Sequence, residues 1–257
     1  MFIPPTTPEF KSHAVEPIEC LKAGYDLVRN QYWLLVGMSA IGLIIGSVGP
    51  LGILMGPMMC GIYLALFEVR RGKTVEFNLL FKGFDYFGES IVATLLHMVP
   101  LLIVLVPSYI AFYVGMFMMM PQGGGDPDPT AFLAFFGAAM VFWIVIMVII
   151  ILLSIGFTFA YPLIVDRKLS GLNAVKLSIK AAMANFWRLL GLSLMTGAMN
   201  MIGVMLCYIG VFFVIPINFA AIAMAYEQVF GLGEFQPNLP PPPPTFGNPS
   251  PQDYVRT

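Results

Sequence analysis

Charged side chains divide this chain into long apolar windows. Four windows of 36 to 38 residues contain no Asp, Glu, Lys or Arg, and they cover residues 30–67, 90–125, 129–165 and 189–226. A helix needs only roughly 20 apolar residues to cross a bilayer, so each window is long enough for one span or for a hairpin of two. The pattern predicts an all-α, polytopic transmembrane helical bundle.

The basic clusters between the windows indicate how often each window crosses. Short loops rich in Lys and Arg stay on the cytoplasmic side of a membrane. One span per window would place the basic residues of segment 70–82 opposite those of the N-terminal segment. Hairpins in the first and last windows, with turns near 46–50 and 207–210, remove this conflict. We therefore predict six spans, at about 33–49, 50–68, 90–118, 131–162, 188–206 and 209–227.

This topology places the protein in a bacterial inner (plasma) membrane with both termini in the cytoplasm. The loops 68–89 and 166–188 are then cytoplasmic, and the acidic loop 121–130 is external. An alternative with eight spans splits the middle windows, at Pro100 and Pro107 among other places, and moves the acidic loop inside. Composition fits a membrane protein, since 58% of the residues are hydrophobic and 11% are charged.

An internal repeat relates the two ends of the apolar region. Adding 154 to the residue numbers of one apolar helical stripe gives a second apolar stripe, and Trp33 then matches Trp187. The stripes are Ile18, Leu21, Tyr25, Val28, Tyr32 and Leu172, Val175, Ile179, Ala182, Phe186. We predict a duplicated unit of one amphipathic helix followed by a hairpin. A shorter stripe at Phe77, Leu80, Phe84 and Phe87 leaves a third unit open.

These observations divide the chain into three parts. Residues 1–14 form a disordered segment, residues 15–232 form the membrane domain, and residues 233–257 form a proline-rich tail. Within the membrane domain, repeat 1 covers about 16–70, the middle hairpin about 77–165 and repeat 2 about 170–230. The tail favours extended polyproline II, which cytoplasmic proteins with an aromatic groove recognise. The alternative is a solvated tail without a partner.

The amphipathic helices predict contacts with lipid. We expect their apolar stripes in the headgroup region, with Lys176 and Lys180 toward water or anionic lipid. Trp33 and Trp187 are the expected interfacial anchors. The alternative is that these helices are connectors that only set the entry angle of the next span.

Polar residues inside the spans are the first place to look for function in a membrane protein. The candidates for an intramembrane polar path are Glu68, His97, Asn200, Asn218 and Glu227. For His97 the alternative is one hydrogen bond inside the bundle, and for Glu68 it is an ion pair with a cation of the adjacent loop. We expect no catalytic residue, cofactor, metal site or nucleic-acid partner, since no metal-ligand spacing and no phosphate-binding loop occurs.

Three short motifs resemble a known class. Asn185-Phe-Trp187, the preceding Tyr161–Lys168 segment and Leu80–Phe84 resemble an uncharacterised family of bacterial polytopic membrane proteins. That family is similar to the membrane domain of some glycerophosphodiester phosphodiesterases. The resemblance implies a six-span inner-membrane domain over about residues 15–230. It implies no catalytic residue, because the phosphodiesterase chemistry belongs to a separate soluble domain.

The leading functional hypothesis is a non-enzymatic integral membrane protein that acts by association, as a scaffold, regulatory or assembly partner. Its partners would be the lipid bilayer and a cytoplasmic protein bound to the proline-rich tail. The alternative is a transporter or permease component for a small or lipid-like solute. A lipid-active membrane enzyme is the third hypothesis.

Overall fold

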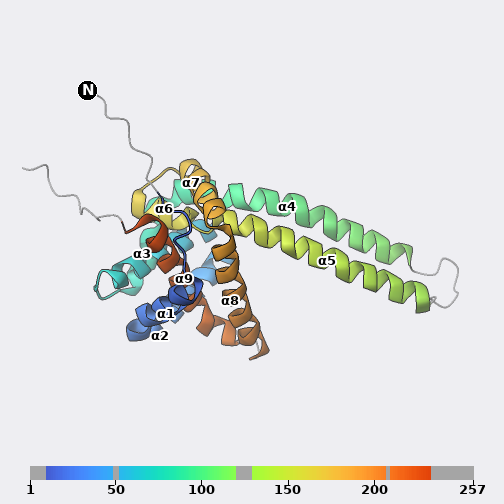
Figure 1. Ribbon diagram of the computed structural model, residues 1–257, viewed down its shortest axis with the longest axis horizontal. Coiled ribbons are helices and arrows are strands. Elements are labelled where there is room, and N and C mark those ends of the chain that lie inside the picture. The colour runs from blue at the N-terminus through green and yellow to red at the C-terminus, as the bar shows by residue number, and fades with distance from the viewer. Residues whose placement is uncertain (1–9, 49–51, 120–128, 207–208, 233–257) are drawn as a thin grey trace, which may run out of the picture.

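The computed structural model describes residues 10–48, 52–119, 129–206 and 209–232, and within these ranges it contains helices and loops but no strand (Figure 1). The helices are α1 (Pro17–Val28), the short 3-10 helix η1 (Arg29–Gln31), α2 (Tyr32–Val48), α3 (Met55–Arg70), the 3-10 segment η3 (Phe77–Tyr86), α4 (Phe87–Met118), α5 (Pro129–Phe157), α6 (Ala160–Arg167), α7 (Gly171–Ala184), α8 (Phe186–Met205) and α9 (Ile209–Phe230).

Several helical stretches are long and apolar enough to cross a membrane. There are five of them in the described part of the chain: Pro17–Val48, Phe77–Met118, Pro129–Arg167, Phe186–Met205 and Gly210–Phe230. This is consistent with a multi-pass membrane protein. The predicted span at 50–68 corresponds to α3, which has 16 residues. At 1.5 Å per residue α3 is about 24 Å long, shorter than a hydrocarbon core of about 30 Å.

The predicted turns and the external loop lie partly outside the described residues, which omit 49–51, 120–128 and 207–208. Helix α4, in contrast, is described throughout and continues through Pro100 and Pro107. The alternative that splits the chain at these prolines is therefore wrong. A proline removes one backbone hydrogen bond without ending a helix when apolar surroundings leave the chain no better conformation.

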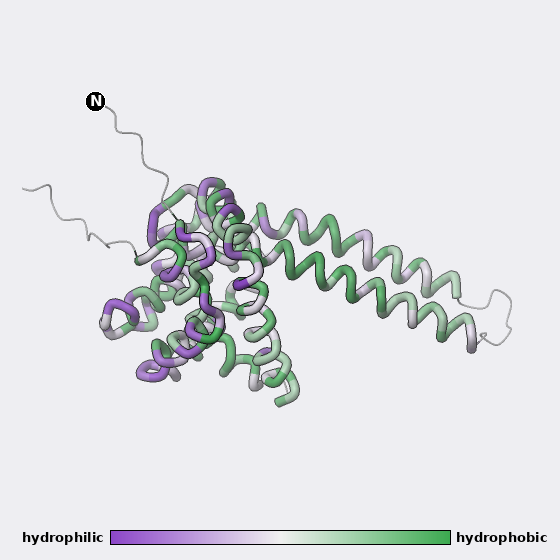
Figure 2. Tube along the Cα trace, in the orientation of Figure 1, coloured by the Kyte–Doolittle hydropathy of each residue, from purple (hydrophilic) through white to green (hydrophobic). Residues whose placement is uncertain are grey.

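Three helical hairpins, α2–α3, α4–α5 and α8–α9, leave a common centre. Each is a pair of neighbouring helices in contact. The α4–α5 hairpin reaches far beyond the other helices (Figure 1), and both of its helices are hydrophobic along most of their length (Figure 2). Three shorter helical segments, α1, η3 and α7, precede these hairpins in the chain.

Each short segment packs against the hairpin before it in the chain, and α1, which has no hairpin before it, packs against the last hairpin. Segment η3 packs on α3, α7 packs on α5 and α6, and α1 packs on α9, which closes the circle. Small residues allow the close approach. A Cβ atom added to Gly24 would lie 2.7 Å from the backbone nitrogen of Ala221, and one added to Gly83 would overlap the carbonyl of Pro57.

The buried faces of α1 and α7 differ from the predicted stripes. The buried residues Cys20, Gly24 and Val28 recur, with 154 added, as the buried residues Ala174, Ser178 and Ala182. Of the predicted stripe positions, Ile18, Tyr25, Leu172 and Ile179 are exposed, whereas Val28, Val175 and Ala182 are buried. Part of each stripe therefore faces outward, and the line of small residues packs against the bundle.

The centre of the molecule is an aromatic core formed by α3, by α9 and by the link between α5 and α6. Tyr226 of α9 has ring centroids of Phe67, Phe159 and Phe230 at 5.6, 6.3 and 5.1 Å. Phe67 belongs to α3, and Phe159 lies between α5 and α6. All three hairpins thus contribute to one apolar contact, and their charged ends are brought together beside it.

The first described residues are tied to the last helices. The Lys11 amide donates a hydrogen bond to the Val229 carbonyl at 2.9 Å, and the Asn185 side chain bonds the carbonyl of Lys11 and the amide of Ala14. The segment expected to be disordered, 1–14, overlaps this region at residues 10–14. Residues 1–9 and the proline-rich tail from 233 lie outside the described residues.

Candidate functional site

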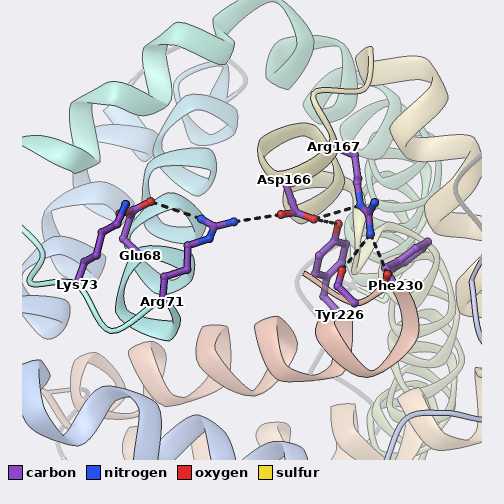
Figure 3. A network of polar contacts seen from close by, with 8 residues as sticks. Glu68, Arg71, Lys73, Asp166, Arg167, Tyr226 and Phe230 are labelled. Atoms are coloured by element: carbon purple, nitrogen blue, oxygen red, sulfur yellow. Dashed lines mark hydrogen bonds and ion pairs between the residues drawn. The ribbon is translucent and has the colours of Figure 1, made fainter. Parts of the chain in front are cut away.

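A cluster of charged side chains lies where the second helices of the three hairpins end. It contains one acid each from α3, from α6, which follows the α4–α5 hairpin, and from α9, with four cations and a tyrosine around them. We call this group the junction cluster, and its residues are Glu68, Arg70, Arg71, Lys73, Asp166, Arg167, Tyr226 and Glu227. Figure 3 labels Glu68, Arg71, Lys73, Asp166, Arg167 and Tyr226 of this group. Three acids and four cations leave the group with a formal charge of +1.

Asp166 is the buried centre of the cluster, because only 1% of its side chain is exposed. Its Oδ2 atom accepts a hydrogen bond of 2.8 Å from the Tyr226 hydroxyl. Its Oδ1 atom lies 3.5 Å from an Arg71 nitrogen, and Arg167 Nε lies 3.3 Å from Oδ2. A carboxylate removed from water costs several kcal/mol unless such partners surround it, so these contacts offset the burial of Asp166.

Arg71 joins Asp166 to Glu68. One Arg71 nitrogen is 3.4 Å from Glu68, and Lys73 Nζ is 2.7 Å from the other oxygen of the same carboxylate. Glu68 and Arg71 are on or next to α3, while Asp166 ends α6. The chain Lys73–Glu68–Arg71–Asp166 in Figure 3 therefore connects the first hairpin to the second.

Two further contacts connect α9 to the other hairpins. Arg70 binds both carboxylate oxygens of Glu227, at 2.7 and 2.9 Å, and this hydrogen bonding raises the pKa of the Arg70 guanidinium. Because 46% of the Arg70 side chain is exposed, solvent limits this pair to about 1 kcal/mol at most. Arg167 donates to the carbonyls of Phe230 and Gly231, which a helix end otherwise leaves without partners.

Chemically, the cluster is a network of opposite charges. Each acid is paired within the cluster: Glu68 with Arg71 and Lys73, Asp166 with Arg71 and Arg167, and Glu227 with Arg70. Such a network can hold three hairpins in one arrangement. If the ion pairs were broken, the hairpins would be less firmly held together.

The five predicted path residues fall into three groups. Glu68 and Glu227 belong to the junction cluster. Asn218 of α9 donates a 2.9 Å hydrogen bond to Asn200 of α8. His97 of α4 stacks on Phe157 of α5, with ring centroids 4.6 Å apart. Among the described residues, neither the asparagine pair nor His97 hydrogen-bonds to the junction cluster, and His97 Nε2 and Asn218 Oδ1 are buried without a hydrogen-bond partner.

The four predicted interfacial residues all lie at the surface. The side chains of Trp33 and Trp187 are the most open, at 74% and 78% exposed. Trp33 contacts Phe213 edge to face at 5.9 Å. Lys176 is exposed, and Lys180 Nζ lies 5.9 Å from the ring centroid of Phe10.

The described part of the chain contains neither a group of metal ligands nor a disulfide. No group of three His, Cys, Asp or Glu residues could hold a metal ion there. Cys20 and Cys60 are buried, and the Cys20 thiol lies 3.1 Å from the side-chain oxygen of Gln228. Cys207 lies outside the described residues.

Sequence reasoning selected two of the three acids and missed the central one. Asp166 ends the middle hairpin as Glu68 and Glu227 end the others, so the shorter third stripe could have identified it. Arg71 and Tyr226 had no such signal, because their contacts with Asp166 join residues 95 and 60 positions apart.

Comparison with known proteins gives a family but no characterised relative. The family described as a domain of unknown function, DUF7847, matches residues 82–247. This region contains α4 to α9, and with them Asp166, Arg167, Tyr226 and Glu227, but not the α3 side of the junction cluster. No curated protein and no solved structure matches the chain. Because 166 of the 257 residues are matched, the chain belongs to the DUF7847 family.

Proposed function

We propose that this protein is a non-enzymatic integral membrane protein that acts by association, as a scaffold, regulatory or assembly partner. The observation that carries the proposal is the α4–α5 hairpin. Its outer half lies away from every other described helix and is hydrophobic (Figures 1 and 2). Large apolar side chains there are open on both helices, for example Phe117 at 65% and Leu133 at 75% exposed.

The partner we assign to this hairpin is a second copy of the chain. A hollow of about 200 Å³ lies between α4 and α5, and it is lined by three small alanines, Ala111, Ala138 and Ala139, and by three phenylalanines. Small residues let membrane helices approach closely. The exposed rings of Phe132 and Phe136 lie within two turns of this hollow on the same helix. A two-fold pair can therefore place the rings of each copy in the hollow of the other.

The alternative of a transporter or permease component has less support. Four of its five candidate path residues are engaged in internal contacts: Glu68 and Glu227 in ion pairs, and Asn200 and Asn218 with each other. A path for a solute needs polar groups that exchange partners during transport. The junction cluster instead supports the association hypothesis, because it fixes the hairpins that would carry the partner surface.

We further propose six spans from a threefold unit, with both termini on the cytoplasmic side of a bacterial inner membrane. Adding 59 and 154 to Gly24 gives Gly83 and Ser178, and each of these residues is buried in a short segment that packs on the preceding hairpin. The basic junction cluster and the positive-inside rule support cytoplasmic loops there. The likeness to the membrane domain of glycerophosphodiester phosphodiesterases rests on the short motifs alone, and a cytoplasmic partner for the tail from 233 is likewise a proposal.

Self-association can be measured by energy transfer between copies that carry donor and acceptor fluorescent proteins, reconstituted together in liposomes. We expect concentration-dependent transfer for the wild type. Ala139→Trp fills the hollow and is expected to weaken association by about tenfold, equivalent to about 1.4 kcal/mol. Val145→Trp adds the same ring to α5 at a residue that is 52% exposed and outside the hollow, so it is the matched control.

Three results would contradict the proposal. They are a wild type that gives no transfer at any protein-to-lipid ratio, equal effects of the two tryptophan variants, and unchanged transfer for Ala139→Trp. Solute uptake by the same liposomes, lost on Glu68→Gln or Glu227→Gln, would favour the transporter hypothesis instead.

A further inference from the structure

A second hollow lies at the turn between α1 and α2. It has a volume of about 500 Å³ and is lined by Tyr25 and residues 29–34, that is, by the end of α1, by η1 and by the start of α2. It is far from the α4–α5 surface in the chain and is not part of the junction cluster. Its lining combines a guanidinium group, two side-chain amides and three aromatic rings.

The cation in this hollow has a partner that it can exchange. Arg29 forms an ion pair of 3.2 Å with Asp26, and their side chains are 60% and 62% exposed. Because solvent weakens a pair this exposed, a phosphate can compete with Asp26 for the guanidinium. The planar guanidinium of Arg29 can bind two oxygens of a phosphate at once. The single contact of Asp26 with Arg29 does not prevent this.

The hollow lies at a boundary between charged and apolar surface. On one side, the Gln31 side chain donates to the Lys73 carbonyl and accepts from the Val75 amide, so the charged loop after α3 is fixed beside it. On the other side, the Tyr32 hydroxyl and the Trp33 ring contact Phe213 of α9. Exposed Trp and Tyr at such a boundary are typical of the headgroup level of a membrane.

The second repeat unit provides an internal comparison. Adding 154 converts Trp33 to Trp187, and both rings are similarly exposed. The same offset converts Arg29 to Met183 and Tyr25 to Ile179. The second unit therefore keeps the interfacial ring and lacks a cation at the position of Arg29, while its own cations, Lys176, Lys180 and Arg188, lie at other positions.

We propose that the hollow at the α1–α2 turn binds the phosphate of an anionic lipid headgroup. Arg29 binds the phosphate oxygens, Asn30 supplies a further donor, and the rings of Tyr25 and Trp33 contact the glycerol and upper acyl region. The site is independent of the association surface on α4–α5.

Tryptophan quenching can test the site in nanodiscs of phosphatidylcholine that contain a minority of phosphatidylglycerol. Variants that retain only Trp33 or only Trp187 report on the two units separately, since the third tryptophan is Trp143. We expect phosphatidylglycerol with brominated acyl chains to quench Trp33 more than brominated phosphatidylcholine does at the same fraction. For Trp187, whose unit has Met183 at the position of Arg29, the difference between the two lipids should be smaller.

Arg29→Gln should remove the excess quenching of Trp33, whereas Lys22→Gln, which removes an exposed cation of the preceding helix α1, should leave it unchanged. Circular dichroism checks that both variants are folded. Equal quenching of Trp33 by both lipids, or excess quenching that survives Arg29→Gln in a folded protein, overturns the proposal. A saturable change of Trp33 emission with soluble glycerol phosphate, in discs without anionic lipid, would overturn lipid as the occupant.

Discussion

Asp166→Asn is expected to lower the free energy of unfolding by about 3 kcal/mol, the largest effect of any single polar substitution in the junction cluster. The Asp166 carboxylate is 1% exposed and compensates Arg71 and Arg167 while it accepts from Tyr226. Removing one partner of a buried ion pair typically costs about 3 to 5 kcal/mol. The lower value applies because Arg71 and Arg167 are 21% and 30% exposed, so water partly solvates them.

The measurement is unfolding by sodium dodecyl sulfate in mixed micelles, followed by circular dichroism. Asp26→Asn is the matched control, because that aspartate is paired with Arg29 but is 62% exposed, and we expect a change within about 0.5 kcal/mol. Tyr226→Phe keeps the core ring, loses the hydrogen bond to a charged acceptor and should cost about 2 kcal/mol. If Asp166→Asn behaved like Asp26→Asn, the junction cluster would not hold the hairpins together.

The positions of the helices could be predicted from the sequence because charge-free windows and loop charges are local signals. Helix α4 covers Phe87–Met118 where a span at about 90–118 was predicted, and α8 covers Phe186–Met205 for 188–206. The order of helices after α7 also follows the order after α1. These features depend on neighbouring residues, so they need no knowledge of which helices touch.

The buried faces could not be predicted in the same way. In a soluble protein the most apolar line of a helix marks its core face, but lipid is as apolar as a protein interior, so this rule fails in a membrane. Helix α1 illustrates the difference, because Ile18 and Tyr25 are exposed while Cys20 and Gly24 are buried. Small residues would have been the better indicator, since they permit the contact of Gly24 with Ala221.

The junction cluster was only partly predictable for a related reason. Each acid has several cations in the adjacent loops, and the sequence does not say which of them lies within ion-pair distance. Arg71 selects Asp166 only because the aromatic core around Tyr226 brings α3 and α6 together. The pairing of these charges therefore depends on how segments far apart in the sequence pack together.

Gly61→Leu is expected to prevent folding, or to lower the free energy of unfolding by more than about 3 kcal/mol, because overpacking a contact that cannot relax exceeds the usual cost. A Cβ atom on Gly61 of α3 would overlap the carbonyl of Leu80 in η3. Across the same contact, a Cβ atom on Gly83 would lie 2.5 Å from the Gly61 nitrogen. Both obstacles are backbone atoms, so no side-chain rotation can relieve them, and even Gly61→Ala should be strongly destabilising.

Gly37→Ala in α2 and Gly197→Ala in α8 are the controls, because a Cβ atom at either position meets nothing within 4 Å. Alanine favours a helix over glycine by about 1 kcal/mol, so we expect these two variants to be neutral or slightly more stable. Size-exclusion chromatography gives the folded yield, and unfolding in mixed micelles gives the free energy. If Gly61→Ala were as stable as Gly37→Ala, η3 would not pack on α3, and the circular packing of short segments on hairpins would lose one of its three contacts.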